Sequence, residues 1–100
     1  MNLTITENEG RTLAKIEGRI GMAETADFEN RMQPLLLGDN PDIEIDCSEL
    51  SYISSSGLRL LFTLQKSVNE RKGKLALVNM QESVKRVFAM TGFSKIINVQ

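Results

Sequence analysis

The most informative part of the chain reads Ile45-Asp46-Cys47-Ser48-Glu49-Leu50-Ser51-Tyr52-Ile53-Ser54-Ser55-Ser56-Gly57-Leu58-Arg59. Apolar residues alternate with acids over residues 43–47, which predicts a short strand. From about Ser56 to Glu70 apolar residues recur at helical spacing, which predicts a helix with a wide buried face. We expect a loop from Ser48 to Ser54 between these two elements.

Three consecutive serines stand where this helix is expected to begin. The first backbone N–H groups of a helix lack internal partners and carry a partial positive charge, so a serine oxygen or a phosphate can be held there. Capping uses one hydroxyl and contributes about 1 kcal/mol. The surplus is explained either by polar loop residues or by a hydroxyl that is available to another protein, and the pattern alone leaves both open. Gly57 should allow other backbone to approach closely.

The flanking sequence predicts the remaining elements. Two antiparallel strands should meet at the turn Asn8-Glu9-Gly10, and a helix over Met22–Leu37 should kink or end early because Pro34 costs about 3 kcal/mol inside a helix. The apolar run Leu75–Val78 predicts a central strand that is covered on both faces and parallel to residues 43–47. The remaining signals are the end of the second helix at Arg71, Lys72 and Gly73, a third helix with Val84, Val87 and Phe88 that stops at Gly92, and a short closing strand near Ile96, Ile97 and Val99.

These elements predict an α/β fold in the order ββαβαβα(β). We expect a single domain over residues 1–100, with a mixed sheet of four to five strands packed against about three helices.

Composition excludes several classes of function. The net charge is -1, and with lysines and arginines spread among acids we expect neither nucleic-acid binding nor membrane insertion. Cys47 is the only cysteine, so no internal disulfide can form, and it should be a buried apolar residue rather than a reactive thiol. The first residues do not resemble a signal peptide, and we expect a cytoplasmic protein.

An enzymatic role is not expected. The chain has no histidine, so the commonest general base and metal ligand are missing, and no phosphate-binding glycine loop is present. We expect neither a metal nor a cofactor. A serine hydrolase that uses Lys66 or Lys74 as a base beside Ser55 is a minor alternative.

The whole chain resembles the STAS domain family, which is named for sulphate transporters and anti-sigma factor antagonists. The most specific part is similar to the family signature Asp-x-Ser-x-x-x-aromatic-(Ile/Met)-(Asp/Ser)-Ser-(Ser/Thr/Ala)-Gly-Leu, and it is matched from Asp46 to Leu58. Residues 73–78 and 91–96 resemble the fourth strand and the exit of the third helix. The resemblance is strongest to stand-alone anti-sigma factor antagonists.

That resemblance implies a partner-switching function. In such proteins an anti-sigma factor that is also a serine kinase phosphorylates the serine that corresponds to Ser55, and a serine phosphatase reverses the modification. Unmodified protein binds the anti-sigma factor, and phosphorylated protein is released. The implied contact residues around Ser55 are Gly21, Met22, Tyr52, Ser54, Ser56, Gly57 and Arg59.

The chain departs from the commoner family pattern at two positions. Ser54 and Gly21 stand where that pattern has acids. These departures favour an alternative with the same fold, in which the chain is a constitutive STAS protein-binding module of a transport or signalling assembly.

Overall fold

The computed structural model describes all 100 residues, which form a mixed four-stranded sheet with three α-helices. The strands lie in the order β1-β2-β3-β4; β1 is antiparallel to β2, and the other neighbours are parallel. The predicted fold class is therefore confirmed. The strands are β1 (Asn2–Asn8), β2 (Arg11–Ile20), β3 (Asp42–Ile53) and β4 (Lys74–Val78), the helices are α1 (Thr25–Arg31), α2 (Ser55–Glu70) and α3 (Glu82–Thr91), and the 3-10 turns are η1 (Met22–Glu24), η2 (Gln33–Leu36) and η3 (Phe93–Lys95).

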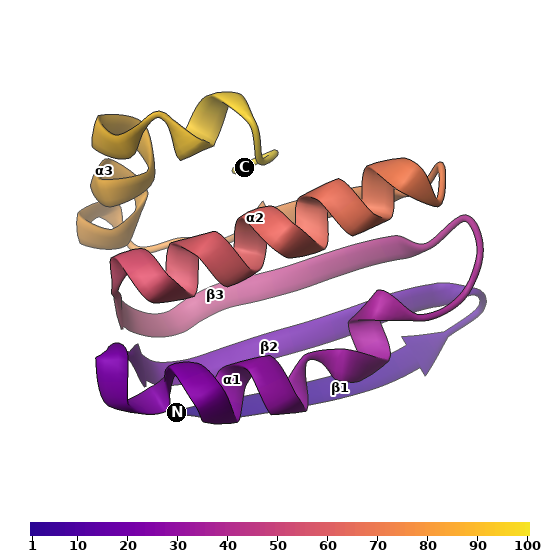
Figure 1. Cartoon of the computed structure of the whole chain (residues 1–100), viewed down its shortest axis with the longest axis horizontal. Helices are drawn as coiled ribbons and strands as arrows, with labels where there is room; N and C mark the ends of the chain where they lie inside the picture. Colours follow the sequence, from indigo (N-terminus) through magenta and orange to yellow (C-terminus); the bar gives the residue numbers. More distant parts are fainter.

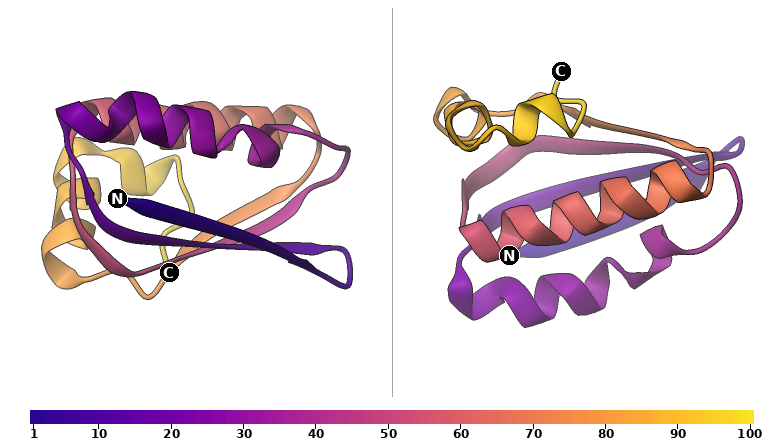
Figure 2. Two further views of the ribbon diagram at one scale, coloured as in Figure 1. Left: turned by 90° about the horizontal axis from the view of Figure 1, so that it is seen from below. Right: turned by 45° about the horizontal axis from the view of Figure 1, so that its top comes forward.

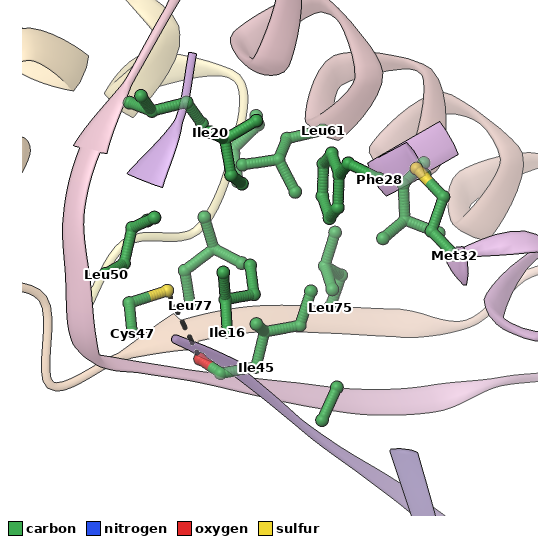
Figure 3. Packing of buried hydrophobic residues seen from close by; sticks show 14 of the residues in the cluster. Ile16, Ile20, Phe28, Met32, Ile45, Cys47, Leu50, Leu61, Leu75 and Leu77 are labelled. Atoms are coloured by element: carbon green, nitrogen blue, oxygen red, sulfur yellow. Dashed lines mark hydrogen bonds between the residues drawn. The ribbon is translucent and has the colours of Figure 1, made fainter. Parts of the chain in front are cut away.

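The core lies between one face of the sheet and the helices. Helices α1 and α2 lie side by side on this face and begin at the same end of the sheet, whereas α3 lies at that end beyond α2 (Figures 1 and 2). Figure 3 shows side chains from α1 and α2 meeting those of the strands. Burial of each large aliphatic or aromatic side chain contributes about 1.5–3 kcal/mol. The fully buried residues include Ile16, Ile20, Phe28, Met32, Ile45, Leu50, Leu61, Leu64 and Leu77.

Strand β3 is longer than the sequence predicted. The expected loop from Ser48 to Ser54 is wrong, because the strand continues to Ile53. Lys15 of β2 pairs with Asp46 of β3, 31 positions later in the chain, whereas this separation is 32 positions at Glu17 and 33 at Arg19. Strand β3 therefore contains two extra residues relative to β2. Bulges of this kind interrupt the alternation of buried and exposed side chains, and this concealed the strand.

The expected first helix is divided by its proline. Helix α1 ends at Arg31, and Pro34 lies in the first turn of η2, where a missing N–H group is tolerated. The prediction of an early end is confirmed.

Helix α2 ends in a Schellman motif. Lys72 donates its N–H group to Asn69, Gly73 donates to Val68, and Lys72 rather than Gly73 has the left-handed backbone conformation. Gly73 is needed for space, because a Cβ atom there would collide with the carbonyl oxygen of Pro41. Gly92, by contrast, ends α3 with a φ of 82°, as expected.

Strand β4 is an edge strand, so its predicted central position is wrong. Only Leu75 and Leu77 of this strand are buried. The expected closing strand is reduced to one parallel bridge between Leu77 and Val99. An apolar run of four residues does not distinguish a strand covered on both faces from an edge strand that is half covered.

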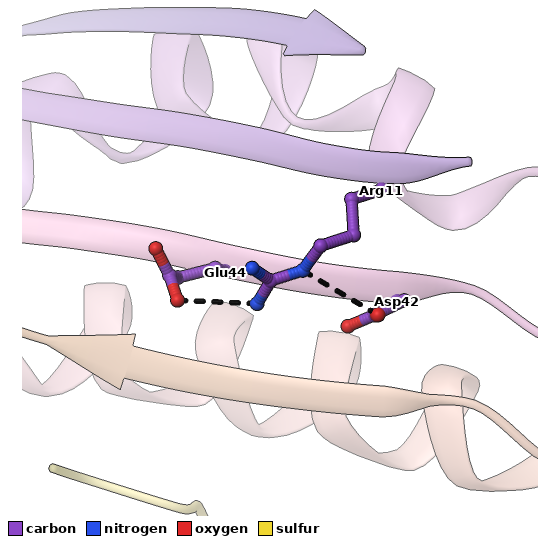
Figure 4. A network of polar contacts seen from close by, with 3 residues as sticks. All are labelled: Arg11, Asp42 and Glu44. Carbon is purple, nitrogen blue, oxygen red and sulfur yellow. Dashed lines mark hydrogen bonds and ion pairs between the residues drawn. The ribbon is translucent and has the colours of Figure 1, made fainter. Parts of the chain in front are cut away.

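The face of the sheet opposite α1 and α2 is polar. Arg11 of β2 forms ion pairs with Asp42 at 3.4 Å and Glu44 at 3.1 Å on β3 (Figure 4). These groups are exposed, so each pair contributes at most about 1 kcal/mol. No helix combines the length and apolar character needed to span a lipid bilayer.

Arg71 joins the end of α2 to the segment that precedes β3. Its guanidinium group donates hydrogen bonds to the carbonyl oxygens of Leu35, Leu37 and Gly38 at 2.7–3.1 Å, and also to Ser67. Carbonyl groups left without helical partners after η2 are thereby satisfied by one cation.

We expect Arg71→Ala to lower the free energy of unfolding by about 2–4 kcal/mol, because several charge-assisted hydrogen bonds are lost together. Urea denaturation followed by circular dichroism measures this change. Arg86→Ala is the matched control, since the Arg86 side chain forms no ion pair or hydrogen bond, and its effect should stay within about 0.5 kcal/mol. Equal effects of the two substitutions would contradict the assigned role of Arg71.

Candidate functional site

The ends of β2 and β3 and the starts of η1 and α2 meet at one end of the sheet (Figure 1). Ile20 pairs with Ile53, and the Ser54 N–H group donates to the Ile20 carbonyl at 2.8 Å. Because β2 and β3 are parallel, the loops that follow them emerge at the same edge. Residues 21–22 and 54–56 are therefore neighbours although they are more than 30 positions apart.

The three serines have different environments. Ser54 is the N-cap of α2; its side chain is 5% exposed and accepts a hydrogen bond from the Gly57 N–H group at 3.2 Å. The Ser56 hydroxyl donates to the sulfur of Met22 at 3.3 Å. Ser55, the first residue of α2, is exposed, and its hydroxyl has no hydrogen-bond partner in the protein. Ser55 alone of the three presents a free hydroxyl.

Gly57 sets the distance between α2 and the sheet. A Cβ atom at this position would lie 2.8 Å from Cγ1 of Ile53 and 2.9 Å from Cγ2 of Ile20. The expectation that other backbone approaches Gly57 is wrong, because the nearest atoms belong to the side chains of Ile53 and Ile20, and Gly57 itself is buried. Gly57 and Ser54 position the site, and the surface available to a partner is supplied by their exposed neighbours.

Gly57→Ala should lower the free energy of unfolding by about 1–3 kcal/mol, because the added methyl group overpacks two buried isoleucines. Chemical denaturation provides the measurement. Ser55→Ala, in the same helical turn, should change stability by no more than about 0.5 kcal/mol. A Gly57→Ala protein as stable as wild type would show that the first turn of α2 is not tightly packed.

Half of a capping box shapes the turn at Gly21, which has no side chain to supply the other half. The Gly21 N–H group donates to Oε1 of Glu24 at 2.9 Å, and Thr25 Oγ1 donates back to the Gly21 carbonyl at 3.1 Å. This arrangement holds Met22 outward with its side chain 75% exposed. Sequence reasoning missed Glu24, because the usual signature has Ser, Thr, Asp or Asn at the cap, whereas this turn has Gly21.

Tyr52 lies against Arg19 on the neighbouring strand. Tyr52 is 42% exposed, and the Arg19 guanidinium carbon lies 4.4 Å from the centroid of its ring. An exposed cation–π contact contributes about 0.5–1 kcal/mol. The sequence did not indicate Arg19, because the second β3 bulge sets its pairing with Tyr52.

Asp46 and Ser48 belong to the signature but organise the chain away from the serines. Asp46 Oδ1 accepts the Ser48 N–H group at 3.0 Å and the Asn79 amide at 3.4 Å. The hydrogen bond from the Ser48 backbone is the main reason that the pKa of Asp46 lies below its usual value. Gln81 donates to the Ser48 carbonyl at 3.0 Å, so this network also anchors the segment after β4.

Asp46→Ala should destabilise the protein at pH 7 and have progressively less effect below about pH 4. A carboxylate whose pKa is lowered by folding contributes stability above its unfolded pKa, and this contribution is lost as the pH falls through the folded pKa. Urea denaturation of both proteins at pH 7 and in acid tests this expectation. A difference that does not change with pH would contradict it.

The single cysteine, Cys47, is buried in the core. Burial raises the pKa of the Cys47 thiol to about 12, which keeps it protonated. No cluster of three or more histidine, cysteine, aspartate or glutamate side chains is arranged to hold a metal ion. A shallow hollow lined by Thr4, Thr6, Lys15 and others lies on the sheet and does not include the serines.

Charge is distributed unevenly along the chain. Residues 55–100 contain eight lysines and arginines and two acids, whereas residues 1–54 contain four lysines and arginines and eleven acids. The expectation that basic residues are spread among acids is therefore wrong.

Helix α2 has no acid in its first turn, so no side-chain carboxylate competes for the positive end of the helix dipole.

Comparison with known proteins places the chain in one family. A family model described as "STAS domain" matches residues 2–100. The anti-sigma-B factor antagonist of Bacillus subtilis is 28% identical over 99 residues, which cover 99% of this chain and 90% of that protein. An anti-sigma factor antagonist from Mycobacterium paratuberculosis has the same fold, with a TM-score of 0.84, 20% identity and coverage of 98% of this chain and 85% of that one. The anti-sigma factor antagonist SpoIIAA in its unphosphorylated form has a TM-score of 0.79 and 16% identity, with 99% and 88% coverage.

Proposed function

The chain belongs to the STAS domain family, and from this we propose that it is an anti-sigma factor antagonist controlled by phosphorylation of Ser55. Its relative from Bacillus subtilis is named an anti-sigma-B factor antagonist. SpoIIAA, a neighbour of the same fold, exists in a phosphorylated form. The chain acts in this proposal as a regulatory binding protein of the cytoplasm and not as an enzyme.

The observation that carries the proposal is the free hydroxyl of Ser55. Ser54 is occupied as the helix cap, and Ser56 faces Met22, so a kinase that approaches this turn meets one unengaged serine. The Ser55 Oγ atom forms a bond to the γ-phosphorus of ATP on the kinase, the bond from that phosphorus to the bridging oxygen of ADP breaks, and the hydroxyl proton leaves to a base on the kinase. A serine phosphatase reverses the modification by hydrolysis.

Phosphorylation changes the surface without requiring refolding. A phosphate adds about −1.5 to −2 charges, and the N-terminus of α2 favours such an anion. A partner packed on this turn would have to desolvate that charge, which disfavours the complex. Unmodified protein therefore binds the anti-sigma factor, and modified protein releases it. The exposed residues proposed to contact this partner are Met22, Tyr52, Ser55 and Arg59, with Gly21 and Ser56 beside them.

The test is to incubate the protein with ATP and the anti-sigma factor kinase encoded in its own genome, and to record intact mass. Wild type and Ser56→Ala should each gain one phosphate, whereas Ser55→Ala should gain none. Phosphorylation of Ser55→Ala, or no phosphorylation of wild type by a kinase that is active on another substrate, would contradict the proposed switch.

A second function has a specific observation in its favour. Gly21 and Ser54 replace acids of the commoner switch pattern, which suits a constitutive binding module of a transport or signalling assembly. Ser55→Asp separates the two functions, because the switch requires at least about tenfold weaker binding, whereas a constitutive module tolerates this charge at an exposed position.

A further inference from the structure

One side of α2 continues from Ser55 along the exposed surface. Ser55, Arg59, Phe62 and Lys66 are spaced at i, i+4, i+7 and i+11, which places them in a line on the helix, and all four are exposed. The opposite side of α2 is buried against the sheet. This line therefore extends outward from the serine site and is not used by the fold.

The line meets the C-terminal segment at an aromatic pair. The rings of Phe62 and Phe93 pack edge to face with centroids 6.1 Å apart, and the segment around η3 lies beside α2 (Figure 1). Phe62 remains 38% exposed. Ile96, three residues after Phe93 at the end of η3, is 51% exposed. We define the α2–η3 strip as Ser55, Arg59, Phe62, Lys66, Phe93 and Ile96.

The two cations of this strip are not neutralised by the fold. Neither Arg59 nor Lys66 forms an ion pair or a side-chain hydrogen bond, whereas Arg11 and Arg31 do. They lie on either side of Phe62, in the part of the chain where basic residues outnumber acids. An unpaired cation, a partly exposed aromatic side chain and a second unpaired cation thus follow one another along α2.

We propose that the α2–η3 strip is a docking surface for an acidic surface of a partner protein. In this complex Phe62 enters an apolar pocket of the partner, and Arg59 and Lys66 face carboxylates of the partner. This inference rests on the proposed function, and the occupant is the anti-sigma factor. Phenylalanine and arginine are both enriched in the cores of protein–protein interfaces. Two cations attract an anionic lipid surface by only about 1 kcal/mol each, and they neutralise too few phosphates for tight nucleic-acid binding.

The strip also explains how Ser55 acts on the partner. A phosphate on Ser55 stands four residues before Arg59, the spacing at which opposite charges pair on a helix. The phosphate therefore engages the Arg59 guanidinium and places an anion where the acidic partner would approach. One modification removes an attractive charge from the strip and adds a repulsive one.

The experiment measures binding of the full chain to the anti-sigma factor of its own genome by isothermal titration calorimetry at low and high salt. We expect Phe62→Ala and Lys66→Glu each to weaken binding by about tenfold or more, and the effect of Lys66→Glu to shrink in high salt. Lys74→Glu, which makes the same charge change at an exposed position on β4, should have little effect. Lys66→Glu preserves the test if Phe62→Ala proves unstable.

The outcomes separate the two proposals. In one outcome wild type binds, Ser55→Asp abolishes binding, and Phe62→Ala and Lys66→Glu bind as strongly as Lys74→Glu. This outcome overturns the docking surface and leaves the proposed function standing. No binding of wild type removes the proposed function and the docking surface with it. Binding of phosphatidylglycerol vesicles, with the same sensitivity to Lys66→Glu and no binding of the anti-sigma factor, assigns the strip to a lipid surface and also overturns the inference.

Discussion

The contact of Gly57 with Ile20 and Ile53 determines how the serine site is built. Since no side chain separates the first turn of α2 from these isoleucines, the helix begins directly above the ends of β2 and β3. The Ser54 N–H group then reaches the Ile20 carbonyl, and the Ser54 side chain caps the same turn. The exposure of Ser55 follows from this geometry, because the residues on either side of it are already engaged.

Sequence reasoning succeeded where one local rule decided the outcome. The helical spacing of α2, the early end of α1 at Pro34 and the end of α3 at Gly92 each depend on the backbone preference or burial pattern of a few neighbouring residues. The motif from Asp46 to Leu58 likewise indicated the family, and with it the fold. Among the serines, the sequence singled out Ser55 only through that resemblance.

The missed features depend on contacts between distant segments. The bulges in β3 exist only relative to β2, and they set the pairing that brings Arg19 over Tyr52. The edge position of β4 depends on the C-terminal segment, which forms only the single bridge between Val99 and Leu77 instead of a further strand. The close approach of Gly73 to Pro41, and the hydrogen bonds from Arg71 to the segment after η2, are likewise invisible until the chain is folded. Charge asymmetry and the helical spacing of Arg59, Phe62 and Lys66 could have been read from the sequence, but the contact between Phe62 and Phe93 could not.

The two bulges of β3 make chain length a constraint separate from residue identity. Between Cys47 and Ile53 the strand gains two positions on β2, and the inward side chains are Cys47, Leu50 and Ile53. Without these bulges, regular alternation from Cys47 would direct Glu49 and Ser51 into the core and turn Leu50 outward. The two extra positions therefore decide which side chains of this segment are buried, whereas a substitution changes single contacts at a fixed position. They also bring Ile53 level with Ile20 at the end of β2, so that the cap residue Ser54 follows directly at the edge of the sheet.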